Sequence, residues 1–366
     1  MRHPSQNAAS QDPDAAAPRG ASATTTRRLR IALGTWVAIE ATRAADGAAA
    51  LSETVLDGTD AAARRGPEGT KATAEAASAT ESATANARAN VAEPTTANAR
   101  ASATAPVVAN ARARAATQPP SGSAENAGAS TAELDAINAA YDAISEVDAQ
   151  MHPARPGSDL ALINSTAPGT PIEVHPDTWR LLQIARRIYD LTDGVFDPCL
   201  PTRPGRLGDI EIKPETPALI CHAPVQLDLG GIAKGYAIDR AVEALLAQGC
   251  TAGLVNAGGD VRVFGDRTET ILLRQHARGG ARDSYRPVEL TATALAVSDL
   301  DATERPPEHQ GYYNRAGGAP TPRRYAAVIA KDATTADALT KYVLLCPAAS
   351  TERVLREFAA QSIEMG

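Results

Sequence analysis

The chain has 366 residues and a formal net charge of −7 at pH 7. This length allows two domains, but the low-complexity content favours one large domain with disordered segments. The acidic balance excludes the basic surface typical of nucleic-acid binding, and no apolar run is long enough to span a membrane. The cysteines lack metal-type spacing, so we expect buried thiols at Cys199, Cys221, Cys250 and Cys346.

The N-terminal part divides into a tail and a strand. Residues 1–26 are rich in Ala, Ser, Thr, Gln and Pro, which bury too little apolar surface to order a chain, so we expect a disordered tail. Residues 27–43 are largely apolar but are interrupted by Gly34 and Thr35. We interpret them as the first strand of the folded domain, with a bulge or a close backbone approach at the glycine.

A long low-complexity segment follows at residues 44–129. It is dominated by Ala, Thr, Arg, Asn and Glu, and Ala-Asn-Ala-Arg recurs from residues 85, 97 and 109. Alanine supports transient helix, but no apolar face is present to dock one. We predict a disordered insertion within the domain, which resumes at residues 130–362.

Two amphipathic helices are predicted after the insertion. Ser130 and Glu133 have the spacing of a capping box, and apolar residues then recur at helical spacing as far as Val147. Pro176 occupies the first position of the second helix, which ends at residues 192–194.

Residues 228–239 combine a glycine turn with the start of a third helix. They read Asp-Leu-Gly-Gly-Ile-Ala-Lys-Gly-Tyr-Ala-Ile-Asp, and Gly249 is placed as the C-terminal cap. The paired glycines, Gly230 and Gly231, let the backbone approach a ligand or take positive φ, and a helix N-terminus presents N–H groups and a positive dipole end. This arrangement favours an anion, most simply a phosphate.

A second glycine turn follows at residues 256–260, which read Asn-Ala-Gly-Gly-Asp between two predicted strands. Asp228, Lys234, Asn256 and Asp260 all lie near the ends of these elements, where polar groups can converge on one pocket. The alternative is that the turns serve packing alone, because paired glycines beside a strand are a weak motif.

The C-terminal part continues with strands and a helix. Short strands are predicted at residues 270–274, 287–290 and 325–331, and a last helix begins at residues 334–341. Asp337 lies in the first turn of this helix, where a carboxylate interacts favourably with the helix dipole without needing a metal.

The order of these motifs closely resembles the ApbE family of FAD:protein FMN transferases, in which Asp-Leu-Gly-Gly-Ile-Ala-Lys-Gly is followed by Asn-Ala-Gly-Gly-Asp. Similar segments lie at residues 151–164, 194–198 and 336–341. The resemblance covers nearly all of the chain outside the tail and the insertion. It implies one α+β, T-fold-like domain with mixed or antiparallel sheets covered by helices.

The resemblance also implies an FAD site. Asp228 would bind the adenosine ribose, and Lys234 would reach the phosphates or the adenine side. The family's flavin-stacking aromatic corresponds to Ala154 here, and Phe196 has a second interpretation as a core anchor. The implied cofactor-binding residues are Leu33, Val195, Phe196, Asp197, Asp228, Gly230, Gly231, Lys234, Asn256, Gly258, Gly259 and Asp260.

A Mg²⁺ site is implied as well. The resemblance assigns the ion to Asp337, the backbone carbonyl of Gly231 and a threonine. That threonine is Thr340 here, one residue early, and Lys341 occupies its usual position. One residue corresponds to about 100° of helix rotation, so we retain both Thr340 and Lys341 as candidates for the metal site.

Two further segments resemble the family less closely. Residues 294–299 lie where the family has a Thr-Ser-Gly turn, with Ser298 retained. His309 lies in a loop and is a candidate base, with a merely solvated histidine as the alternative. The implied catalytic residues are Asp337, Lys234 and His309.

The implied activity is Mg²⁺-dependent transfer of FMN from FAD to a threonine hydroxyl of an acceptor flavoprotein, with release of AMP. Two alternatives are a Mg²⁺-dependent FAD pyrophosphatase, in which water replaces the threonine, and a flavin-binding protein without catalysis. Many family members are exported lipoproteins, but residues 1–6 show neither an apolar signal core nor an early cysteine. We therefore expect a cytoplasmic location.

Overall fold

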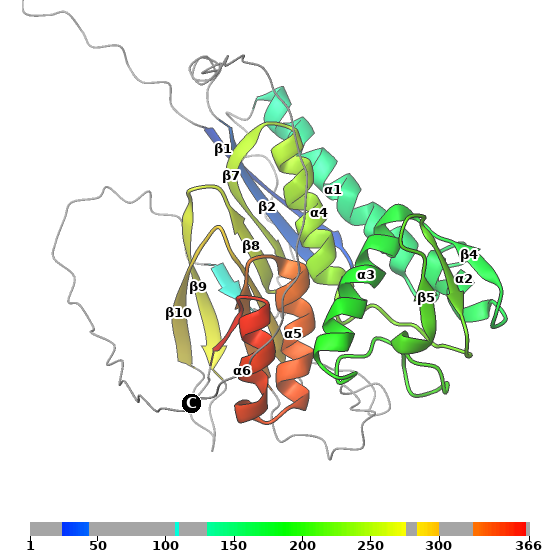
Figure 1. Ribbon diagram of the computed structural model, residues 1–366. Coiled ribbons are helices and arrows are strands. Elements are labelled where there is room, and N and C mark those ends of the chain that lie inside the picture. Colours follow the sequence, from blue (N-terminus) through cyan, green and yellow to red (C-terminus); the bar gives the residue numbers. More distant parts are fainter. Residues whose placement is uncertain (1–23, 44–106, 110–129, 276–283, 300–324, 364–366) are drawn as a thin grey trace, which may run out of the picture. The chain divides into compact units, whose positions relative to one another are not determined.

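The computed structural model describes residues 24–43, 107–109, 130–275, 284–299 and 325–363 (Figure 1). All of them belong to one of the two units into which the chain divides. They form helices and largely antiparallel sheets, which confirms the predicted α+β class. His309 lies outside the described residues.

The main sheet has seven strands among the described residues, and each is antiparallel to its neighbours. Neighbouring strands are therefore often joined by short hairpins. The order across the sheet is β1 (Thr24–Ala32), β2 (Thr35–Arg43), β7 (Cys250–Ala257), β8 (Asp260–Phe264), β11 (Ala294–Asp299), β12 (Tyr325–Ala330) and β13 (Gln361–Ile363).

The two faces of the main sheet contribute to different apolar clusters. Successive side chains of a strand point to opposite faces. Accordingly Leu254 joins a cluster with Ile271 of a second, three-stranded sheet, whereas Val255 belongs to the core that includes the helices. The strands of the second sheet, in order, are β10 (Ser284–Thr291), β9 (Thr268–Gln275) and β3 (Val107–Ala109).

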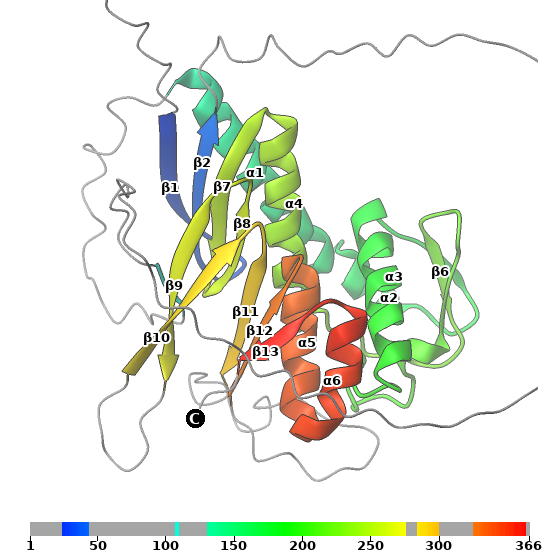
Figure 2. The ribbon, with the colours of Figure 1, turned by 60° about the vertical axis from the view of Figure 1, so that its left-hand side comes forward.

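The helical face is covered by α1 (Thr131–Met151), α4 (Ala233–Ala247) and α5 (Ala333–Leu345) (Figures 1 and 2). Helix α5 packs against α4, β11, β12 and α6 (Ala348–Glu357), and its residues from Ala333 to Leu344 are all buried. The polar side chains of α5 must therefore find their partners inside the protein. This requirement determines the chemistry of the site described below.

The remaining elements lie between α1 and α4 in the sequence. Helix α3 begins at Pro176 and α1 carries the predicted capping box of Ser130 and Glu133, so both predicted helix starts are confirmed. A third, three-stranded sheet has the order β4, β6, β5. The elements are α2 (Asp159–Ser165), β4 (Pro171–Glu173), α3 (Pro176–Leu191), the 3₁₀ turn Leu207–Asp209, β5 (Ile210–Ile212) and β6 (Ala218–Cys221).

The predicted single strand at residues 27–43 is wrong. It is a hairpin of β1 and β2, joined by Leu33 and Gly34, which have φ angles of 53° and 69°. Positive φ at both central residues is typical of a type I′ turn, in which Asn and Gly are the usual residues. Strand β1 also begins at Thr24, so the predicted tail extends too far.

Three further predictions are corrected. Residues 294–299 form the buried strand β11, not a turn, because β11 pairs with both β8 and β12. The short strand β3 lies within the predicted insertion and is parallel to β9. The helix at α5 is not the last, since α6 follows it.

The described cysteines are all buried thiols and form no disulfide with one another, as predicted. Among the described helices, none combines the length and the hydropathy required to traverse a bilayer.

Candidate functional site

Two hairpin turns lie side by side at one end of the main sheet. Gly258 and Gly259, with φ angles of 61° and 102°, join β7 to β8. The Gly258 N–H donates to the Trp36 carbonyl oxygen over 3.1 Å, and a Cβ at Gly258 would lie only 2.8 Å from Thr35 Oγ1. The predicted segments around Leu33 and Gly258 are thus neighbours, although more than two hundred residues separate them in sequence.

The turn at residues 228–232 and the start of α4 leave fewer N–H groups available to a ligand than predicted. Helix α4 begins at Ala233, after both glycines, and Gly230 and Gly231 do not take positive φ angles. The Ala233 N–H donates to the Leu229 carbonyl oxygen over 2.8 Å, and the Gly235 N–H donates to Asp337 Oδ2 over 3.0 Å. Two N–H groups of the first turn therefore already donate hydrogen bonds within the protein and are not available to bind an anion.

Asp228 links the glycine turn to the segment around Phe196. Its Oδ1 accepts a hydrogen bond of 2.8 Å from the Gly230 N–H, and its own N–H donates to the Pro198 carbonyl oxygen over 2.9 Å. Phe196 is buried in the core, as its interpretation as a core anchor predicts. The carboxylate of Asp197 accepts from the backbone N–H of Cys199. The structure thus brings the segments around Asp228 and Phe196 together, and the Phe196 side chain packs in the core.

Four charged side chains form the centre of the site, which we call the lysine–aspartate cluster: Lys234, Asp260, Asp337 and Lys341. Lys234 Nζ pairs with Asp260 Oδ2, and Lys341 Nζ pairs with Asp337 Oδ1. Both aspartate side chains are only 1% exposed and that of Lys341 is 6% exposed, whereas that of Lys234 is 29% exposed. Lys234 is therefore the member of the cluster with the most direct access to a ligand.

Burial and charge act in opposite directions on the two carboxyl groups. Burial raises the pKa of Asp260, although the neighbouring Lys234 ammonium offsets part of this effect. Burial also disfavours the ionised form of Asp337, but the positive charges of Lys341 and Lys234 outweigh it and hold the pKa of Asp337 below its usual range. Asp337 is consequently a carboxylate that depends on the lysines for its charge.

The residues predicted to hold Mg²⁺ do not fit that ion. Asp337 Oδ1 is paired with the Lys341 ammonium, and Oδ2 accepts from the Gly235 N–H. Thr340 Oγ1 donates to the Asp337 carbonyl oxygen over 2.7 Å and lies 2.7 Å from Ser298 Oγ. Mg²⁺ requires several oxygen ligands in near-octahedral geometry, and an ammonium group cannot be one of them.

Some residues of the site were not predicted. Gly235 allows α4 and α5 to approach closely, because a Cβ there would lie 2.2 Å from the Ala333 carbonyl oxygen. An isolated glycine inside a helical pattern is the signal that could have revealed this contact. Asp239, one turn further along α4, accepts from the backbone N–H groups of Ala333 and Thr334 and pairs with Arg262. It therefore fixes the start of α5, on which Asp337 lies.

Replacing Asp239 by Asn should lower the free energy of unfolding by about 2 kcal/mol, because the amide cannot accept all of the hydrogen bonds of the buried carboxylate and loses the charge opposite Arg262. Urea unfolding followed by circular dichroism would measure the loss. Glu243→Gln on the exposed side of the same helix is the control. An equal effect of both variants would contradict the proposed role of Asp239 at the start of α5.

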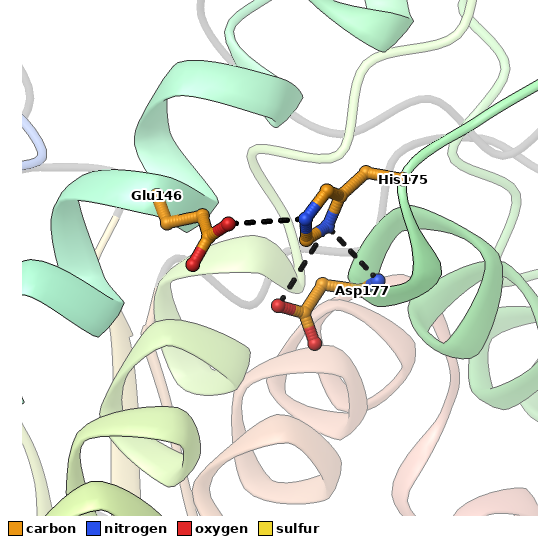
Figure 3. A group of neighbouring side chains, drawn as sticks. All are labelled: Glu146, His175 and Asp177. Carbon is orange, nitrogen blue, oxygen red and sulfur yellow. Dashed lines mark hydrogen bonds and ion pairs between the residues drawn. The ribbon is translucent and has the colours of Figure 1, made fainter.

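The side chains of Glu146, His175 and Asp177 are arranged as the ligands of a metal ion could be (Figure 3). Their ligand atoms lie within 4.8 Å of one another. His175 Nδ1 already accepts from the Asp177 N–H at the start of α3, and Nε2 lies 3.0 Å from Glu146 Oε1. Asp177 in turn accepts from the Tyr236 hydroxyl over 2.7 Å. The arrangement therefore ties α1, α3 and α4 together without an ion.

A cavity of about 620 Å³ lies at β10, β12 and β13. None of the predicted site residues lines it. The cavity and the lysine–aspartate cluster have no residue in common.

The known proteins that are similar in sequence to this chain carry the same name, and a family model matches it as well. The model of the ApbE family matches residues 111–203 and 205–364. The FAD:protein FMN transferase of Rhodobacter capsulatus is 33% identical over 141 residues, which is 31% of this chain and 27% of that protein. The FAD:protein FMN transferase of Treponema pallidum is 26% identical over 179 residues, or 40% of this chain and 49% of that protein. The chain thus matches less than half the length of these relatives.

Solved structures show the same fold at lower identity. The ApbE protein of Thermotoga maritima is 18% identical with a TM-score of 0.59, and covers 93% of each chain. The flavin transferase ApbE of Vibrio cholerae is 16% identical with a TM-score of 0.58, again over 93% of each chain. Because the family model covers well over half of the sequence, the chain belongs to the ApbE family.

Proposed function

We propose that this chain is an FAD:protein FMN transferase, which moves FMN from FAD to a threonine hydroxyl of an acceptor flavoprotein and releases AMP. Family membership and the names of the two curated relatives support the activity. The observation that carries it is Lys234, which lies in the first turn of α4 directly after the glycine turn, pairs with Asp260 and has a side chain that is 29% exposed. Positive charge held in place is what a pyrophosphate substrate needs.

The reaction requires positioning more than a nucleophile from this chain. The acceptor hydroxyl oxygen forms a bond to the FMN phosphorus, the bond from that phosphorus to the bridging oxygen breaks, and AMP leaves with the bridging oxygen. The hydroxyl proton passes to solvent. Lys234, partly exposed and paired with Asp260, is placed to stabilise charge that develops on the phosphoryl oxygens. Asp228 would bind the adenosine ribose.

Mg²⁺ is assigned no step in this transfer. The resemblance implies that the ion binds at Asp337, but Lys341 and the Gly235 N–H occupy that carboxylate.

The test is to incubate the purified protein with FAD and a domain that carries a threonine acceptor, and to follow the mass of the acceptor together with AMP release. An FMN adduct with an equal amount of AMP supports the transferase. FMN and AMP without an adduct would identify a pyrophosphatase. Bound FAD that stays intact with several acceptors would identify a flavin-binding protein, and the proposal would then be wrong.

A further inference from the structure

We propose that the Lys341 ammonium takes the place of a divalent cation at Asp337, so that this chain binds and processes its flavin without a metal ion at that position. The first observation is the contact itself. Lys341 Nζ pairs with Asp337 Oδ1 and donates to the Asp337 carbonyl oxygen over 2.9 Å. Lys341 and Asp337 are four residues apart on α5, so the helix holds this geometry.

The second observation concerns Gly231, whose backbone carbonyl is the other ligand that the resemblance implies. A Cβ at Gly231 would lie 3.5 Å from Lys341 Cε and 3.7 Å from Cγ. The lysine stem therefore lies against Gly231 while its ammonium reaches Asp337. One side chain thus contacts both residues that were expected to share the ion.

The third observation is charge balance. The lysine–aspartate cluster contains two ammonium groups, of Lys234 and Lys341, and two carboxylates, of Asp260 and Asp337. A divalent cation beside Asp337 would add two positive charges within a few ångströms of a buried ammonium. Like charges repel strongly where water is excluded, so repulsion between the ion and the ammonium groups favours the cluster without the ion.

The main test measures metal binding directly, independently of any transfer. Mn²⁺ is titrated into the wild-type protein and Lys341→Thr without FAD, and free Mn²⁺ is followed by electron paramagnetic resonance. We expect Lys341→Thr to bind one more Mn²⁺ than the wild type, because the threonine restores an oxygen ligand beside a carboxylate freed from its lysine. A folded Lys341→Thr that binds no additional Mn²⁺ would overturn the proposal.

A second measurement decides the question even if Lys341→Thr does not fold. The melting temperature of the wild type and of Glu146→Gln is recorded in EDTA and in Mg²⁺. Glu146→Gln removes the group of Glu146, His175 and Asp177 as a source of metal binding, and its side chain is 53% exposed. A melting temperature of Glu146→Gln that is the same in both buffers supports the proposal, and one that Mg²⁺ raises overturns it.

A third measurement, of FMN transfer, rests on the proposed function. FMN transfer by the wild type should be unchanged in EDTA, and Lys341→Thr should lose at least about tenfold in EDTA and recover it with Mg²⁺. FAD affinity, measured by flavin fluorescence, should likewise be the same in EDTA and Mg²⁺ for the wild type. An absence of transfer under all conditions contradicts the proposed function, whereas wild-type transfer that EDTA stops contradicts the role of Lys341.

Discussion

Asp337→Asn should lower the free energy of unfolding by about 3–5 kcal/mol, one of the largest losses that we expect from a single change in this chain. The Lys341 side chain is 6% exposed and pairs with Asp337, which is itself 1% exposed. Without the carboxylate, the buried Lys341 ammonium loses the charge with which it pairs, and the Lys234 charge nearby adds repulsion. Urea unfolding followed by tryptophan fluorescence and by circular dichroism would measure the effect.

Two controls separate a buried ion pair from other causes. Glu211→Gln breaks the Lys213–Glu211 pair, whose side chains are 39% and 44% exposed, and should leave stability nearly unchanged. Adding Lys341→Met to Asp337→Asn removes the buried charge that has lost its paired carboxylate, so the double variant should be more stable than Asp337→Asn alone. If Asp337→Asn were as stable as Glu211→Gln, the buried pair would not hold α5 in the way that we infer.

The elements that the sequence predicts well are those determined locally. The capping box of Ser130 and Glu133 and the proline at Pro176 identify helix starts from a few neighbouring residues, and the structure has both. Gly249 follows the C-terminal end of α4, as expected, and has a φ angle of 78°. The turn at residues 256–260 likewise depends on two glycines that accept positive φ, which few other residues do.

Contacts between distant segments were not predictable in the same way. Leu33 conceals the hairpin between β1 and β2, because a leucine with positive φ carries no turn signal. Lys341 was retained as a candidate for the metal site, but its pairing with Asp337 and its contact with Gly231 depend on how α5 packs on the glycine turn. The sequence therefore locates the site, whereas the packing shows that the cation beside Asp337 is the Lys341 ammonium.

Gly235→Ala should also be strongly destabilising, by about 3 kcal/mol or more. Alanine is favoured over glycine inside a helix by about 1 kcal/mol, so helix propensity alone predicts a gain. The contact with α5 reverses this expectation. A Cβ at Gly235 would lie 2.2 Å from the Ala333 carbonyl oxygen and 2.9 Å from Asp337 Cβ, and the first of these belongs to the backbone, which cannot move aside as a flexible side chain can.

Gly231→Ala is the matched control, four residues earlier in the same motif. The atoms nearest to its Cβ would belong to the stem of Lys341, the first at 3.5 Å, which is ordinary van der Waals contact. We therefore expect little change in melting temperature for Gly231→Ala and a large fall for Gly235→Ala. Because the Gly235 N–H also donates to Asp337 Oδ2, separating α4 from α5 should weaken the lysine–aspartate cluster as well. Equal stability of the two alanine variants would show that α4 and α5 do not approach each other at Gly235.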